Sequence, residues 1–205
     1  MTRRTAGTGP RMAGALCALV LLSVLPSDRD GAAAAQERLT QDEALRLAFP
    51  PPARLERRTA FLDSADLAAV RRAAGEDAAT SQRVVTYYLA RRDGRPLGVA
   101  YFDGHRVRSL QEVLMVVVTP DGRIQRLEVL RFDEPPEYRP PEGWLRQFRG
   151  KALDDDLSLR GGIVRMTGAT LTSQAVTRAA RRVLALHRVI RPFEQAPTGS
   201  AGTTR

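Results

Sequence analysis

The hydrophobic pattern in the middle of the chain predicts a set of antiparallel strands. From Arg83 onward β-branched and aromatic residues dominate, and a polar turn ending in glycine separates them from a second apolar stretch at 97–102. Residues 112–119 form a strongly apolar strand in which 113–118 is apolar on both faces, so we expect a central strand that is covered on both sides. A Pro-Asp-Gly turn follows and predicts a hairpin into a further strand at 124–130.

Two short helices are expected before these strands. Residues 40–43 read Thr-Gln-Asp-Glu, a capping box in which the Thr hydroxyl and the Glu carboxylate each accept a backbone N–H near the start of the helix. Three prolines from Pro50 onward end that helix. Residues 64–74 carry apolar side chains on one helical face, and Gly75 is the expected stop.

A loop, a short helix and a long helix are expected after the strands. The loop at 133–141 contains four prolines, and aromatic residues at 144–148 indicate a short helix. We expect the last helix to begin near Gln174, with Thr172 or Ser173 as its cap, because apolar residues then recur at helical spacing: Val176, Ala179, Ala180, Val183, Leu184 and His187. The predicted fold class is α+β, an antiparallel-rich sheet packed with helices and preceded by a short helical segment.

The first 35 residues have the pattern of a secretory signal peptide. A positive leader with arginines at positions 3, 4 and 11 precedes an apolar run at 12–25, and four alanines at 32–35 offer a cleavage site. The apolar run is only about 21 Å long as a helix, short of the ~30 Å hydrocarbon core, which disfavours an uncleaved anchor. We therefore expect export to the periplasm, or another compartment outside the cytoplasm, and a mature chain starting near Gln36.

Charge and cysteine content narrow the function classes. The 205-residue chain has a net charge of +9, and loss of four Arg and two Asp with residues 1–35 leaves +7. All basic residues but Lys151 are arginines, and they are scattered without interleaved aromatics, so we expect no nucleic-acid partner. The single cysteine, Cys17, excludes a disulfide framework and a cysteine-based zinc or haem site. The contiguous Asp154, Asp155 and Asp156 are expected to form a solvated turn, because neighbouring side chains do not converge on a metal.

The segment 167–173, Thr-Gly-Ala-Thr-Leu-Thr-Ser, is the candidate site. Gly168 allows an unusual backbone angle and the close approach of another group. Unpaired amides and the positive end of the helix dipole are expected near Thr170, an environment that favours a phosphate group. The residues alone leave open the alternative of a capped helix start whose small side chains serve turn geometry.

A resemblance adds to this interpretation. Thr167, Gly168, Ala169 and Thr170 match the [Ser/Thr]-Gly-Ala-Thr motif of the FMN-binding domain family, which includes flavoprotein subunits of the Rnf and sodium-translocating NADH:quinone reductase complexes. The resemblance implies that FMN is joined through its phosphate to the Thr170 hydroxyl by a dedicated flavin transferase. It also covers the surrounding layout, and residues 132–138, 144 and 147–148 resemble a small exported branch of the family. The expected organisation is a signal peptide at 1–35, a helical segment at 36–81, the FMN-binding domain at 82–190 and a flexible tail at 191–205.

The chain departs from the family motif at one position. The family usually has Asp three residues before the Ser or Thr, and this chain has Val164 there. If that Asp helps the transferase to recognise its substrate, attachment is inefficient here or FMN is held without a covalent bond. Val164 therefore favours a second hypothesis, a non-redox binding or assembly module of the same fold that has lost flavin attachment.

The leading hypothesis is an exported electron-transfer flavoprotein that serves redox partner proteins, such as a membrane complex or a cytochrome. Its +7 charge would allow a salt-sensitive association with an anionic membrane face or an acidic cytochrome. A free-standing enzyme is a third hypothesis, with no nucleophile–base pair evident in the sequence. Further candidates for flavin contact lie within and outside the motif: Leu171, Thr172, Ser173, His105, Met166, Arg108, Arg165, Tyr87, Tyr88, Tyr101 and Trp144.

Overall fold

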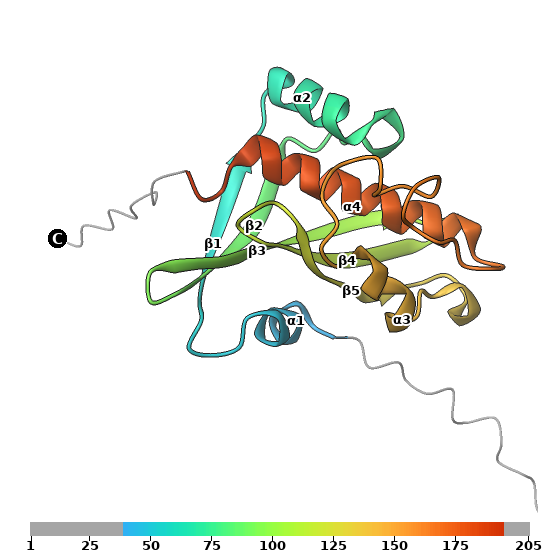
Figure 1. Ribbon diagram of the computed structural model, residues 1–205, viewed down its shortest axis with the longest axis horizontal. Coiled ribbons are helices and arrows are strands. Elements are labelled where there is room, and N and C mark those ends of the chain that lie inside the picture. Colours follow the sequence, from blue (N-terminus) through green and yellow to red (C-terminus); the bar gives the residue numbers. More distant parts are fainter. Residues whose placement is uncertain (1–38, 195–205) are drawn as a thin grey trace, which may run out of the picture. The chain divides into compact units, whose positions relative to one another are not determined.

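The computed structural model describes residues 39–194, in which five strands form one antiparallel sheet. The strands are β1 (Arg54–Phe61), β2 (Val84–Arg92), β3 (Arg95–Arg106), β4 (Gln111–Val118) and β5 (Ile124–Phe132). They lie side by side in the order of the chain, β1-β2-β3-β4-β5 (Figure 1). This confirms the predicted α+β class and the predicted hairpin between β4 and β5.

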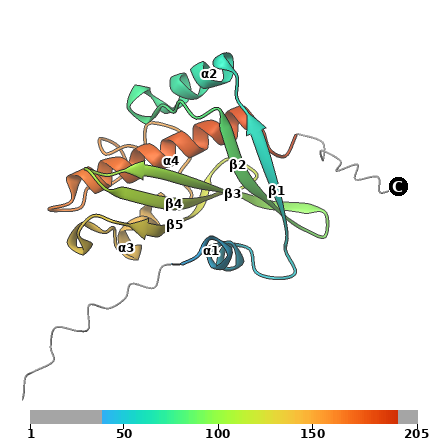
Figure 2. The ribbon, with the colours of Figure 1, turned by 180° about the vertical axis from the view of Figure 1, so that it is seen from behind.

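Helices cover both faces of the sheet (Figures 1 and 2). On one face lie α2 (Ser64–Ala74) and the long α4 (Thr170–Ile190), with the short α3 (Glu142–Leu145) on the same side. On the other face lies α1 (Gln41–Ala48). Single turns of 3-10 helix complete the fold at Glu76–Ala78, Pro136–Tyr138 and Arg146–Phe148.

Strand β4 shows why the sheet is buried on both sides. Leu114, Val116 and Val118 pack toward α4 in the larger core. Met115 and Val117 point the other way and pack with the smaller core around α1. The residues from Leu114 to Val118 are all fully buried, which confirms the prediction of a doubly covered central strand.

The N-terminal helices form as the sequence indicates. Thr40 and Glu43 make the predicted capping box of α1. Helix α2 spans the predicted residues and ends at Gly75, whose φ of +92° is a conformation that favours glycine. An additional box between Asp63 and Asp66 caps the start of α2.

Strand β1 was not predicted, because its pattern does not look amphipathic. The segment 36–81 was expected to be helical, and β1 lies within it between α1 and α2. Its inward positions include Arg58, which is 8% exposed and pairs with Glu56 at 2.8 Å. Because an arginine occupies an inward position with its aliphatic stem buried, the sequence of β1 does not show the alternation of apolar and polar residues that is typical of a strand.

The predicted signal peptide at 1–35 and residues 195–205 of the predicted tail lie outside the described residues. Between residues 39 and 194 no helix combines the length and the apolar character needed to cross a membrane.

Candidate functional site

The Thr-Gly-Ala-Thr segment forms the turn that leads into α4. Gly168 has a φ of +78°, and no heavy atom lies within 4 Å of the position that a Cβ would take. The glycine is therefore required by the backbone conformation rather than by a close neighbour. Helix α4 begins at Thr170, with Ala169 as its N-cap residue. This corrects the prediction of a start near Gln174.

Ser173 fastens this turn instead of capping the helix. Its hydroxyl accepts the N–H of Met166 and donates to the carbonyl of Ala169, both at 3.0 Å. No side chain caps the N-terminus of α4, so the predicted capping role of Thr172 or Ser173 was wrong. Both residues are fully buried because they lie in the first turn, on the face toward the sheet.

The start of α4 leaves backbone donors available beside an exposed hydroxyl. The first N–H bonded within the helix is that of Ser173, which donates to the carbonyl of Ala169 at 3.0 Å. The amides of Thr170, Leu171 and Thr172 therefore have no partner within the helix. The Thr170 side chain is exposed at the same end, where the helix dipole favours negative charge.

A groove of about 650 Å³ opens at this end of the helix. Its size is within the ordinary range for sites that bind small molecules and cofactors. Three segments far apart in the sequence form its walls: the β3–β4 loop, the proline-rich loop after β5 and the start of α4. The lining residues are Val107, Arg108, Ser109, Glu134, Pro135, Tyr138, Gly168, Ala169, Thr170, Leu171 and Thr172.

Exposed apolar side chains gather at the groove. Tyr138 and Leu171 line it, and they are 39% and 46% exposed. Leu110, which is 45% exposed, belongs to the loop that forms one wall. Large apolar groups exposed together around a concave site are typical of a surface that a ligand covers.

Glu134 holds the β3–β4 loop in place. One oxygen of its carboxylate accepts the backbone N–H groups of Arg108, Ser109 and Leu110 at 3.1, 2.8 and 2.8 Å. These hydrogen bonds stabilise the charged form and lower the pKa of Glu134 below its ordinary value. The buried Glu134 carboxylate thus holds the β3–β4 loop, one wall of the groove, against the loop after β5, which forms another wall.

His105 does not line the groove. Its ring lies between two carboxylates, with Nδ1 2.9 Å from Asp103 and Nε2 2.9 Å from Glu112. Burial alone would lower the pKa of His105, but the hydrogen bonds to the two carboxylates outweigh this effect and raise the pKa to about 9. Arg182 of α4 binds Asp103 through two hydrogen bonds of 2.7 Å. The network therefore ties β3 and β4 to α4 beneath the helix, and both ring nitrogens of His105 have partners.

Most of the other candidates for flavin contact are also engaged elsewhere. Tyr87 and Tyr101 are buried and stack on each other, with ring centroids 5.8 Å apart. Trp144 packs edge-on against Phe148. Arg108 lines the groove, whereas Thr167, Met166, Ser173, Tyr88 and Arg165 are not among its lining residues.

Several residues of the groove were not among the candidates predicted from the sequence. Val107, Ser109, Glu134, Pro135 and Tyr138 line it, although only the last three lie in a stretch that carried the family resemblance. The proline-rich loop after the last predicted strand was the available indication of a wall here. A loop pattern does not predict which of its side chains point into the groove.

The position of Val164 is defined by its backbone. Its N–H donates to the side-chain oxygen of Gln147 at 2.8 Å, and its carbonyl accepts the indole N–H of Trp144 at 2.7 Å. The Val164 side chain is 74% exposed. A different side chain could therefore stand at this position without disturbing its contacts.

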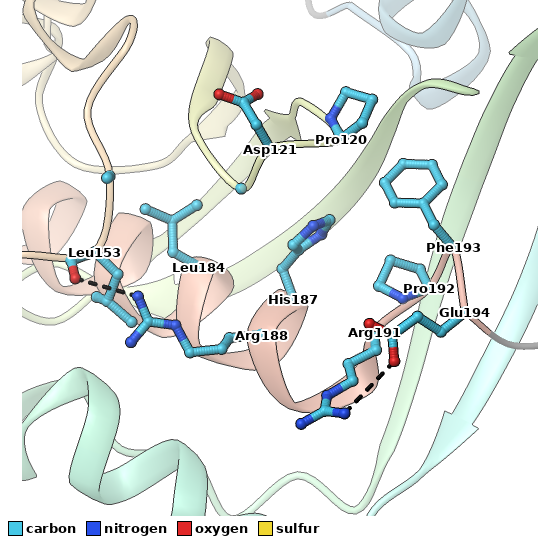
Figure 3. Close-up of a pocket in the computed structure, with 12 residues that line it drawn as sticks. Pro120, Asp121, Leu153, Leu184, His187, Arg188, Arg191, Pro192, Phe193 and Glu194 are labelled. Carbon is cyan, nitrogen blue, oxygen red and sulfur yellow. Dashed lines mark hydrogen bonds and ion pairs between the residues drawn. The ribbon is translucent and has the colours of Figure 1, made fainter. Parts of the chain in front are cut away.

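A second pocket lies at the opposite end of α4 (Figure 3). It has a volume of about 430 Å³, and His187 and Leu184 point into it from the helix toward Pro120 and Asp121. His187 is hydrogen-bonded to the Tyr101 hydroxyl at 3.1 Å, and burial lowers its pKa to about 4. At 1.5 Å per residue, His187 is roughly 25 Å from Thr170 along the helix, so this pocket is separate from the groove.

The comparison with protein families gives one finding. Residues 111–185 match the FMN-binding domain family. This part of the chain is similar to FMN-binding domains. It runs from β4 through most of α4 and contains the Thr-Gly-Ala-Thr turn, as the sequence resemblance predicted. The match indicates a flavin-binding protein.

The searches for individual relatives found none. No curated protein matches the chain, and no solved structure matches it. The assignment of the FMN-binding domain therefore depends on the family match and on the geometry of the groove.

Proposed function

We propose that the protein carries one FMN, joined through its phosphate to the Thr170 hydroxyl, and transfers electrons between redox partners outside the cytoplasm. One observation carries the proposal: the Thr170 side chain is exposed at the edge of a groove of about 650 Å³, beside backbone amides that have no helical partner. The alternative of a simple capped helix start would not require either the groove or the exposed apolar side chains around it.

The residues of the groove fit the parts of FMN. The free amides and dipole at the start of α4 suit the phosphate. Leu171, Tyr138 and Val107 provide apolar surface for the ring system. Arg108 supplies a positive charge at the wall, where it would stabilise negative charge on a bound flavin.

The cofactor would supply the redox chemistry, since a flavin accepts one or two electrons. The protein's own contribution is to position the flavin and to set its electrostatic surroundings. Glu134 keeps the β3–β4 loop at the groove, and Ser173 keeps the turn at the start of α4. Attachment through Thr170 would prevent loss of the cofactor in a compartment where FMN is not readily replaced.

The expected maturation follows from the family resemblance. After export, a flavin transferase would form the phosphoester at Thr170, with a net gain of one FMN and loss of one water. Val164 in the place of the usual Asp supports the alternative, a non-redox binding or assembly module that no longer receives the flavin. The exposure of the Val164 side chain is compatible with a role in contact with another protein.

Intact-mass spectrometry tests the proposal. We expect protein exported in a host with the flavin transferase to gain the mass of one FMN less one water. Thr170→Ala should abolish the gain because it removes the acceptor oxygen, and Thr170→Ser should retain at least part of it. An unmodified, colourless protein would instead favour the non-redox alternative, and a modified Thr170→Ala protein would place the bond elsewhere.

A further inference from the structure

A second groove, with a volume of about 580 Å³, runs along the outer side of α4. The end of α2 and the turn after it form one wall, and the loop before the Thr-Gly-Ala-Thr segment forms another. The lining residues are Ala74, Gly75, Glu76, Asp77, Ala78, Ser158, Leu159, Arg160, Arg165, Gln174, Thr177, Arg178 and Arg181. Neither the family match nor the proposed FMN site assigns a role to this groove.

Three arginines at the groove have no partner among the described residues. Arg160 and Arg165 are exposed and Arg178 is half-buried, and within 39–194 none of them makes a side-chain hydrogen bond or ion pair. Many other arginines of the fold are paired, such as Arg126 with Glu128 at 2.6 Å. Guanidinium groups that gather in a groove and are not paired with its carboxylates are available to bind carboxylates from outside.

Arg181 shapes the groove from beneath. Its guanidinium donates to the carbonyls of Ala74, Asp154 and Leu157 at 2.9, 2.8 and 3.1 Å. It thereby holds the end of α2 and the loop before α4 against α4. In these contacts its positive charge faces carbonyl groups and is not neutralised by a carboxylate. The groove is therefore shaped by contacts within the fold, and the charge of Arg181 adds to its positive potential.

The groove begins next to the proposed flavin attachment residue. Gln174 lies four residues after Thr170, which places it on the same helical face about 6 Å further along the axis. Thr177 and Arg181 continue that face. A molecule seated in the groove would therefore lie beside the flavin site rather than at a distance from it.

We propose that this groove is the docking site for an acidic segment of a partner protein. The opposite wall carries Glu76 and Asp77, so the surface is mixed in sign. A uniformly anionic membrane or a phosphate group would be repelled by that wall, whereas a protein segment can place carboxylates against the arginines and a donor against Glu76 and Asp77. The identification of the partner as a redox protein rests on the proposed function. The docking of an acidic segment is independent of it.

The test uses binding of a fluorescent peptide that carries several glutamates and a terminal lysine to the full chain at low salt, followed by fluorescence anisotropy. All proteins carry Thr170→Ala, so that the result is independent of flavin attachment. The variant Arg160→Gln/Arg165→Gln/Arg178→Gln should weaken binding by about tenfold, given the usual small contribution of each exposed charge. The matched control is Arg57→Gln/Arg72→Gln/Arg95→Gln, which removes the same charge from exposed positions outside the groove and should change binding by about twofold or less.

Chemical-shift mapping on the protein with all its arginines gives a second readout that does not depend on the folding of a variant. The peptide should shift the amide signals of Gln174, Thr177 and Arg178. Equal weakening by the two triple variants, or shifts spread over the whole surface, would overturn the proposal. So would binding to phosphatidylglycerol vesicles that depends on the same three arginines, because this would identify a membrane surface as the ligand.

Discussion

Three hydroxyl residues within four positions have different environments. Thr170 is exposed, whereas Thr172 and Ser173 are fully buried. Thr172 is rotated by about 200° from Thr170 around the helix axis and therefore lies on the opposite side. Ser173 lies closer to the side of Thr170, but its hydroxyl is held inside the turn by Met166 and Ala169. Of the three, only Thr170 has an exposed side chain at the groove.

Val164→Asp tests whether the departure from the family motif limits flavin attachment. The Val164 side chain is 74% exposed, and its contacts are made by the backbone. We expect the substitution to raise the flavin-modified fraction, because it restores the residue that the family usually has. The free energy of unfolding should change by no more than about 0.5 kcal/mol, as is usual for an exposed position.

The measurement for Val164→Asp is the ratio of modified to unmodified protein by intact mass after expression with the flavin transferase. Val164→Asn is the matched control, since it has nearly the same shape and no charge. A modified fraction that stays the same in both variants would show that this position does not limit the reaction.

At the scale of the element, the start of α4 depends on Ser173. Its hydroxyl joins the N–H of Met166 to the carbonyl of Ala169 across the turn. Ser173→Ala should lower the free energy of unfolding by about 1–2 kcal/mol, because the Met166 N–H loses its partner. Urea denaturation measures this change, and the exposed Thr167→Ala is the control, expected to change stability much less.

Flavin attachment gives an independent readout of the same variant. If Ser173 orients the turn, Ser173→Ala should also lower the modified fraction, although the acceptor Thr170 is intact. Normal attachment and unchanged stability would together contradict the role of Ser173.

The elements that the sequence predicted are those in which local chemistry and packing agree. The capping box at Thr40, the stop at Gly75 and the apolar β4 each carry their own indication. Strand β1 carries none, because Arg58 takes an inward position that is normally apolar. The start of α4 was placed too late because hydroxyl residues suggest a cap, whereas here Ser173 bonds backward to the turn.

The candidate site was predictable only in part for a similar reason. The motif, with the proposed acceptor Thr170, is contiguous in the sequence, so the pattern alone could indicate the turn at the start of α4. The other walls come from the β3–β4 loop and from the loop that holds Glu134 and Tyr138, and only the folded sheet brings these together. His105 was a reasonable candidate in a loop-like stretch, but Asp103 and Glu112 engage both of its ring nitrogens.

At the scale of the whole molecule, His105 and His187 give stability opposite dependences on pH. The folded-state pKa of His187 is lowered to about 4, so its contribution is complete above pH 6.5 and is lost as the pH falls from 6.5 toward 4. The loss amounts to about 3 kcal/mol at most. The folded-state pKa of His105 is raised to about 9, so its contribution is complete below pH 6.5 and is lost as the pH rises through 9.

Urea denaturation between pH 5 and 7 measures the His187 contribution. We expect the free energy of unfolding to fall as the pH is lowered across this range in the unsubstituted protein, and to fall less in His187→Gln, which cannot gain a proton. His105 and the carboxylates, including Glu112 whose pKa burial raises, are present in both proteins, so their contributions cancel when the two slopes are compared. Identical slopes in the two proteins would show that His187 is not held in its neutral form.

The order of the strands has a consequence for how the protein acquires its site. Each strand from β2 to β5 is joined to the next by a short connection and pairs with it, so this part of the sheet can grow by successive hairpins, whereas the longer β1–β2 connection contains α2. Helix α4 comes last and is tied to β3 through Arg182 at Asp103 and His187 at Tyr101. The Thr170 hydroxyl therefore gains its surroundings only at the final docking step, and a transferase that requires them would modify completed molecules and pass over unfinished ones.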